Sequence, residues 1–242
     1  MIRFIRRLRQ DMLSSNRLKK YFLYAIGEIL LVVVGILLAL QLNEWNAQRK
    51  LNIESVEYKA KIIEDLKLDT TRMARLIRRS KRIRQGVADY FSYFDEGNHS
   101  ITALLDSSRR VRYRFFRLNP QDYTLTDMQS SGKTGLLTET ERKTLFDLAT
   151  RKGYLHEILD SRMDEITQYQ FERNKYLDFD LSEKNFFEVI NRPLSASDLT
   201  KGLLQQHNVL REIDQMNEVM INFGSSLYDD SVACIELLAN DE

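Results

Sequence analysis

The sequence is poor in cysteine, proline and glycine, and each shortage excludes a class of protein. Cys234 is the only cysteine among 242 residues, so no intramolecular disulfide framework can form. In an oxidising compartment its thiol is free or forms an intermolecular bridge, and burial on a C-terminal helix is the interpretation we favour. Two prolines and nine glycines provide too few turns for many short strands, which favours long helices.

Complete catalytic and metal-binding motifs are also missing. The run SGKT at residues 131–134 looks like the end of a phosphate-binding loop, but the first glycine of that motif would fall on Asp127. Gly132 is better interpreted as a helix C-terminal residue with positive φ. His156 and the next residue begin like a zinc-protease motif, yet Asp160 stands where the second histidine belongs. The sequence therefore predicts no enzyme, no metal and no cofactor.

One long apolar run is present, from Phe22 to Leu42, and its length suits a membrane span. A helix needs about 20 apolar residues to cross a bilayer, and this run contains a single charged residue, Glu28. A cleaved signal peptide is the main alternative, but its apolar region would be shorter and would end at a small-x-small site, which is absent here. We expect a transmembrane helix over residues 21–43, with Trp45 at the membrane interface.

Basic residues before the apolar run predict its orientation. Residues 1–20 hold seven Lys or Arg, and we expect five of them at the lipid headgroups: Arg6, Arg7, Arg9, Lys19 and Lys20. Fewer cations follow the run, so the positive-inside rule places residues 1–20 in the cytoplasm and exports residues 44–242. This exported part has 29 basic and 33 acidic residues, which argues against nucleic acid as a partner.

Helical periodicity continues after the apolar run. Apolar residues recur every three or four positions over residues 51–94, 145–176 and 199–238, and the last two stretches follow capping boxes that begin at Thr138 and Ser195. In the connector at residues 95–123, apolar and basic residues alternate over 111–115, which predicts a short strand. The expected fold is all-α, an N-terminal transmembrane helix that continues into an elongated antiparallel helical bundle.

Arginine is concentrated in two clusters. Seven cations lie between Arg72 and Arg84, and we interpret them as a solvated helix face paired with later acidic helices, with an anionic polymer or an acidic partner as the alternative. The second cluster spans residues 109–117. A packed edge segment with outward arginines is favoured there, and a partner-binding surface made by Arg112, Arg114 and Arg117 is the alternative.

Glu28 is the sharpest candidate for a functional residue. A charged group inside hydrocarbon costs about 3 kcal/mol on insertion scales and usually faces protein or water. Gly35 and Ala39 lie near the same helix face, and their small side chains permit close helix approach. We expect a helix contact within an oligomer or with a partner, and the alternatives are a proton or ion pathway and no specific role.

Three segments of the sequence carry a resemblance to a known family. They are YFLYAIGEI at residues 21–29, GILLALQLNEWN at residues 35–46 and TLTDMQSSG at residues 124–132 with the helix that follows. These segments resemble an uncharacterised family of Bacteroidota membrane proteins, characterised only as a domain of unknown function. The resemblance implies a bacterial inner-membrane location with a periplasmic domain, but no activity, substrate or catalytic residue.

The leading functional hypothesis is a non-enzymatic, oligomeric periplasmic adaptor or sensor-like module. Its expected partners are the lipid bilayer, further copies of itself and another envelope protein. The alternative hypothesis is an accessory subunit of a proton-driven envelope motor or transporter, in which Glu28 carries the proton. Replacing Glu28 with Gln distinguishes the two, because proton coupling would be lost without loss of assembly.

Overall fold

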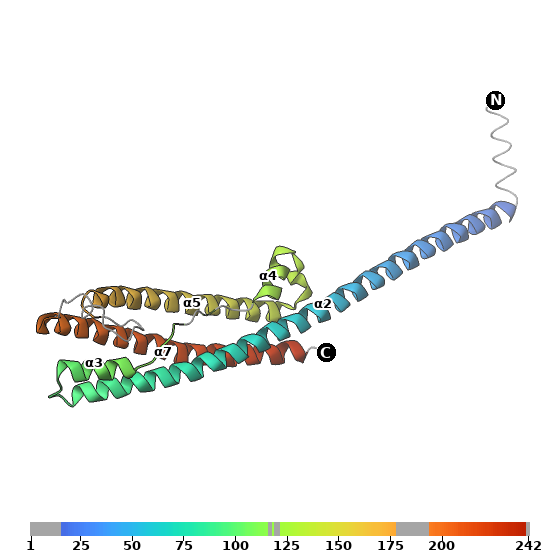
Figure 1. Ribbon diagram of the computed structural model, residues 1–242. Coiled ribbons are helices and arrows are strands. Elements are labelled where there is room, and N and C mark those ends of the chain that lie inside the picture. The colour runs from blue at the N-terminus through green and yellow to red at the C-terminus, as the bar shows by residue number, and fades with distance from the viewer. Residues whose placement is uncertain (1–15, 116–117, 119–121, 178–193, 241–242) are drawn as a thin grey trace, which may run out of the picture. The chain divides into compact units, whose positions relative to one another are not determined.

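The computed structural model describes residues 16–115, 118, 122–177 and 194–240. The chain divides into two compact units, Met1–Val56 and Glu57–Glu242. Helix α2 (Asn16–Asp95) contributes its first part to one unit and its second part to the other (Figure 1). The described residues form helices and connectors and no strand, so the prediction of an all-α fold is confirmed.

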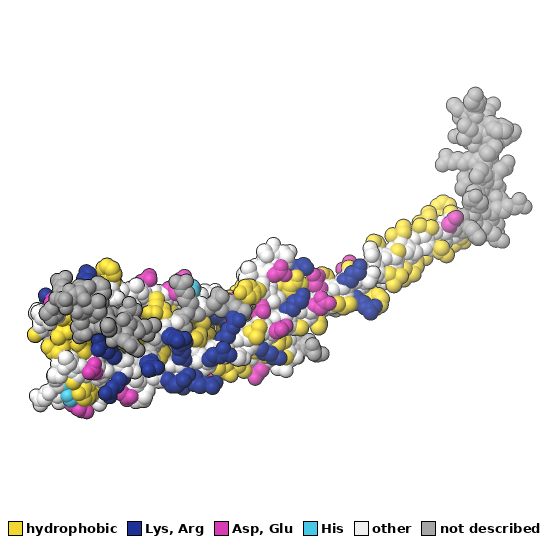
Figure 2. Space-filling view, viewed as in Figure 1, with side chains coloured by type: hydrophobic (Ala, Val, Ile, Leu, Met, Phe, Trp, Pro, Cys, Tyr) yellow, Lys and Arg dark blue, Asp and Glu magenta, His cyan; other side chains and the backbone are white. Residues whose placement is uncertain are grey.

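The first unit consists, where it is described, of the beginning of α2. Most of its described side chains between Phe22 and Leu42 are exposed and apolar, and Trp45 is exposed a few residues later (Figure 2). By length and composition alone, this helix can cross a membrane. A helix that exposes apolar side chains on every face requires an apolar environment, because water solvates such a surface poorly.

The second unit is a bundle of three long helices. The end of α2 packs with α5 (Glu139–Asn174) and α7 (Ala196–Ala239), and the shorter elements are α3 (Ile101–Arg110), α4 (Tyr123–Ser130) and the 3₁₀ helix η1 (Lys133–Leu136) (Figure 1). The predicted helical bundle is therefore confirmed.

Side-chain contacts define the directions of these helices. On α2 and α5, Lys59 pairs with Glu141 and Asp69 pairs with Lys152, so the residue numbers rise together and the two helices are parallel. Helix α7 is antiparallel to both, so the predicted antiparallel packing holds for α7 but not between α2 and α5. Against α2, Asp214 pairs with Arg84, while the later residue Gly224 lies beside the earlier residue Met73. Against α5, Glu212 pairs with Arg162, while the later residue Ser226 bonds to the earlier residue Arg151.

Local sequence signals set the ends of the helices. Both predicted capping boxes form: the Thr138 side chain accepts the Glu141 amide, and the Ser195 side chain accepts the Asp198 amide. Each box satisfies amides that have no partner inside the first helical turn. Gly132 ends the segment after α4 with φ 71°, the left-handed conformation that glycine adopts without steric cost. The predicted role of Gly132 is confirmed.

The core of the second unit lies between α2, α5 and α7. Leu155 and Ile166 on α5 and Leu210, Met220 and Leu227 on α7 have no exposed surface. Cys234 is 1% exposed, as predicted for the C-terminal helix, and burial raises the pKa of its thiol. Because each buried side chain of this size contributes about 1.5–3 kcal/mol when removed from water, this interface holds the bundle together.

Two buried ionic contacts join α2 to α5. Lys152 is 1% exposed and donates to Asp69 at 2.7 Å and to Asp122, before α4, at 3.3 Å. Glu141 has no exposed surface and lies 2.7 Å from the Lys59 ammonium. Charges removed from water are stable only when they are paired and hydrogen-bonded, so these contacts specify how α2 and α5 pair.

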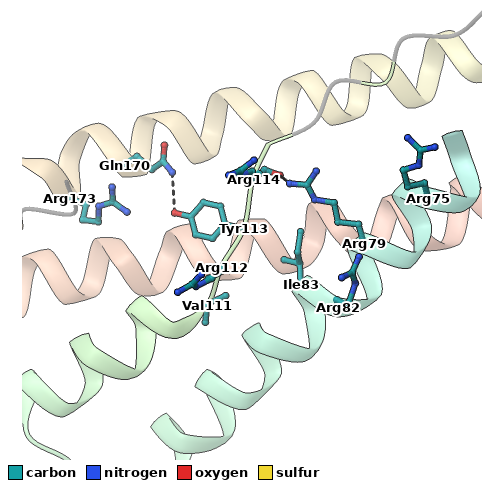
Figure 3. Close-up of a pocket in the computed structure, with 10 residues that line it drawn as sticks. All are labelled: Arg75, Arg79, Arg82, Ile83, Val111, Arg112, Tyr113, Arg114, Gln170 and Arg173. Atoms are coloured by element: carbon teal, nitrogen blue, oxygen red, sulfur yellow. Dashed lines mark hydrogen bonds between the residues drawn. The ribbon is translucent and has the colours of Figure 1, made fainter. Parts of the chain in front are cut away.

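The prediction of a strand at residues 111–115 is wrong. Val111 is buried, Tyr113 is half-buried, and Arg112 and Arg114 are exposed, so the alternation of sides is present up to Tyr113. This segment has no ladder partner among the described residues, because helices surround it (Figure 3). Side-chain packing on helices has produced the alternation that usually indicates a sheet.

His207 on α7 makes the stability of the second unit sensitive to pH. Its ring lies 4.8 Å from the Phe91 and Phe94 rings, and burial lowers its pKa, with Arg211 acting in the same direction and Asp95 opposing. The unfolded chain therefore binds a proton at His207 more readily than the folded chain does. The contribution of neutral His207 to the stability of the fold is present above the ordinary pKa of about 6.5, and it is lost as the pH falls through the lower pKa of the folded state.

We therefore expect the midpoint of urea unfolding to fall more between about pH 7.5 and about pH 5.5 for the wild-type chain than for His207→Phe, which retains a ring but cannot titrate. Circular dichroism of the full chain in detergent measures both midpoints. An equal fall in the two proteins would assign the pH dependence to other groups.

Candidate anion-binding pocket

A pocket of about 1000 Å³ opens in the second unit between α2, the segment after α3 and α5 (Figure 3). Six of its ten lining residues are arginines, and none of the described lining residues is acidic. We call it the arginine pocket, and its lining residues are Arg75, Arg79, Arg82, Ile83, Val111, Arg112, Tyr113, Arg114, Gln170 and Arg173.

Helix α2 supplies one wall of the arginine pocket. Arg75, Arg79 and Arg82 follow one another at intervals of four and three residues, so they lie along one side of the helix. The helical rise places the first and the last of them about 10 Å apart along the axis. The apolar residue Ile83 lies beside this row and is buried.

The extended segment after α3 supplies a second wall and is held from both sides. Arg79 donates to the carbonyl oxygen of Arg114 at 3.1 Å, and Gln170 on α5 donates to the Tyr113 hydroxyl at 3.1 Å (Figure 3). Val111 anchors the beginning of the segment in the core. These contacts position Arg112 and Arg114, which are exposed, at the edge of the pocket.

The end of α5 closes the pocket with a buried guanidinium. Arg173 is 6% exposed and donates to Gln206 on α7 at 2.8 Å and to Asn174 at 2.8 and 3.0 Å. Both of these acceptors are amide oxygens. Arg173 therefore contributes a guanidinium group that the surrounding helices hold in place.

Four arginines of the pocket are not compensated by a described carboxylate. Within the described part of the chain, no carboxylate makes an ion pair with Arg75, Arg82, Arg112 or Arg114. Arg84, two residues beyond Arg82, does pair with Asp214 and Glu218 of α7, and its guanidinium pKa is raised, chiefly by its hydrogen bond to Asp214. Figure 2 shows Lys and Arg side chains gathered along one face of this unit.

The interpretation of the first arginine cluster as a solvated face paired with acidic helices thus holds for Arg84 but not for the arginines that line the pocket. The two clusters identified in the sequence converge on one concavity. Arg173 and Gln170 were missed, because a single Arg or Gln near the end of a long polar helix carries no local signal. Arg112 and Arg114 lie at the pocket edge, and Arg117 lies outside the described residues.

The predicted intramembrane residues lie on the first part of α2. Glu28, Gly35 and Ala39 are exposed, and at about 100° per residue they fall within roughly 40° of one another around the helix. No atom lies within 4 Å of a Cβ built at Gly35. Trp45 is 65% exposed. Arg6, Arg7 and Arg9, and the side chains of Lys19 and Lys20, lie outside the described residues.

His156 begins the incomplete zinc-protease motif. His156 lies 3.5 Å from Asp160 on the exposed surface of α5. Across the described ranges, no three His, Cys, Asp or Glu residues gather as a set of metal ligands. The described lining of the arginine pocket suits the binding of an anion instead.

Comparison with known proteins identifies a family and no activity. The chain matches a family of unknown function, DUF6090, over residues 28–191, which is more than half of its length. No curated protein and no solved structure matches it. The matched range includes most of the apolar part of α2, from Glu28 on, and every lining residue of the arginine pocket. This chain is therefore a member of the DUF6090 family.

Proposed function

We propose that this protein is a single-span, inner-membrane-anchored adaptor or sensor-like module, whose periplasmic helical domain recognises another envelope protein. The observation that carries this proposal is the convergence of two arginine clusters on one pocket in a helical unit that follows an apolar helix. A rigid charged pocket suits recognition, since preorganised guanidinium groups bind anionic groups without first losing side-chain entropy.

Self-association through the membrane helix is the second part of the proposal. Glu28, Gly35 and Ala39 share one exposed face, and a small residue at each of the latter two positions permits close approach of a second helix. A carboxyl group facing lipid would be costly, so contact with a second helix stabilises it. The anchor thus concentrates the helical domains at one membrane surface.

Mild in-cell crosslinking of a C-terminally tagged chain, followed by mass spectrometry of the purified membrane complex, tests the proposal. We expect a stoichiometric complex that contains this chain and a second envelope protein. Recovery of this chain alone, in a defined multiple, would retain the self-association and remove the adaptor role. The Trp45→Phe chain, which keeps an aromatic ring at the same position, provides a matched control for substitutions in the anchor.

The alternative function, an accessory subunit of a proton-driven motor or transporter, rests on the single carboxyl group of the apolar helix. Replacing Glu28 with Gln keeps the size of the side chain but removes its titration. It also replaces one carboxyl oxygen with an NH2 donor, so hydrogen bonds that need both oxygens are lost. If Glu28 only holds helices together, we expect the association constant of the variant to fall by about three- to thirtyfold, with fewer crosslinked oligomers, since interhelical hydrogen bonds contribute about 0.6–2 kcal/mol in membranes. Intact assembly with lost cellular function would favour proton coupling.

A further inference from the structure

The charge of the arginine pocket indicates that its occupant is anionic. Six guanidinium groups surround one concavity, and no described lining residue is acidic. Four of them, Arg75, Arg82, Arg112 and Arg114, are exposed and make no ion pair with a described residue. Like charges held close together repel one another, and an anion placed among them relieves that repulsion.

The shape and the apolar content of the pocket indicate what kind of anion it is. A volume of about 1000 Å³ is at the upper end of ordinary ligand sites, and the arginines are spread over two walls. Ile83 and Val111 are buried residues of the lining, and Tyr113 is a half-buried one. A phosphate group alone would use few of these arginines and none of the apolar surface.

The arginine row on α2 advances in steps somewhat shorter than those of an extended chain, and long Arg side chains can span the difference. Arg75, Arg79 and Arg82 advance along the helix axis by about 6 and 4.5 Å. In an extended peptide, residues that face the same side are separated by about 6.6 Å, so carboxylates at alternate positions can meet successive arginines. Guanidinium groups form bidentate bonds with carboxylates, which gives such a contact both strength and direction.

We propose that the arginine pocket is the docking site for an extended acidic segment of another protein, with carboxylates at alternate positions and an apolar side chain between them. The carboxylates bind the arginines of α2 and of the 111–114 segment, and the apolar side chain contacts Ile83, Val111 and Tyr113. This inference rests on the proposed adaptor function, because it names the chemistry of the recognised partner.

Binding of a labelled peptide to the purified full chain in detergent tests the inference. The probe is a fluorescent peptide of about nine residues with glutamates at alternate positions and valines between them, and the measurement is fluorescence anisotropy at low salt. We expect Arg75→Gln/Arg82→Gln/Arg112→Gln to weaken binding at least about tenfold, since charge-assisted hydrogen bonds are lost. A peptide with Gln in place of every Glu should not bind.

A control variant with the same loss of charge separates the pocket from the general field of the surface. Arg72, Arg78 and Lys81 are exposed on α2 and do not line the pocket. We expect Arg72→Gln/Arg78→Gln/Lys81→Gln to weaken binding by no more than about twofold, because exposed charges act only through a screened field. Equal weakening by the two triple variants would overturn the inference. Unchanged helicity and unfolding midpoints establish that both variants fold.

Other anions provide the outcomes that would replace an acidic segment. If inorganic tripolyphosphate binds the pocket and the peptide does not, the site is a phosphate site and the inference is wrong. Pocket-dependent binding to vesicles rich in anionic phospholipid, again without peptide binding, would assign it to a lipid surface. Peptide binding without a crosslinked envelope protein would overturn the adaptor function but retain the acidic-segment site. A crosslinked envelope protein without peptide binding would retain the adaptor function and overturn the acidic-segment site.

Discussion

Replacing Lys152 with Met is expected to lower the free energy of unfolding of the helical unit by about 3–5 kcal/mol. The Lys152 ammonium is buried and lies 2.7 Å from Asp69 of α2, which is itself 6% exposed. Removing the ammonium takes this cation away from the Asp69 carboxylate, which stays in a poorly solvated site. Asp122, the second acceptor, is more exposed and can turn to water.

Urea unfolding of the full chain in detergent, followed by circular dichroism, measures the loss at Lys152. Lys143→Met, on the exposed side of the same helix, should change the free energy of unfolding by less than about 0.5 kcal/mol. The double variant Lys152→Met/Asp69→Leu should recover most of the stability, because apolar groups of similar volume replace a buried ion pair at little cost. A loss below about 1 kcal/mol in the single variant would show that water solvates Asp69.

Replacing Glu141 with Ala is expected to cost about 3 kcal/mol or more, which exceeds the cost of losing a helix cap. One carboxylate oxygen accepts the Thr138 amide at 2.8 Å, and the other lies 2.7 Å from the Lys59 ammonium. Both contacts disappear in the variant, and the side chain of Lys59, which is only 16% exposed, loses this carboxylate. Helix α5 then loses half of its capping box and an ionic contact with α2 together.

Thr138→Ala is the matched control for Glu141→Ala. Thr138 is exposed and accepts the Glu141 amide, so its removal takes away a capping hydrogen bond and leaves the contact with Lys59 in place. We expect a loss of about 1 kcal/mol. Equal losses in the two variants, measured by the same urea titration, would mean that Glu141 acts only as a cap.

The ends of the helices and the apolar segment could be predicted from the sequence because both depend on local interactions. Thr138 and Ser195 cap helices with side chains that reach three residues along the same chain. Gly132 adopts positive φ because it lacks a Cβ, a property of one residue. The apolar length of the first part of α2 is likewise visible in composition alone.

Alternation at residues 111–115 led to a wrong prediction because it reports which side chains turn inward and not what they turn toward. Val111 and Tyr113 pack on helices, and an equally good alternation would arise beside a second strand. A sheet requires a neighbouring strand whose backbone groups pair with the segment, and distant parts of the chain determine whether one is present. Local pattern therefore predicted the side of each residue but not the element.

The sequence by itself determined the long helices, their caps, an apolar segment of membrane-spanning length and the presence of two arginine clusters. Only the tertiary structure decided that these clusters share one pocket and that Arg173 completes it. Helical periodicity specifies which residues share a face, but the neighbour of that face depends on packing between segments that are far apart in the chain. In this protein, the pairing of α2 with α5 through Lys152 and Glu141 sets that arrangement.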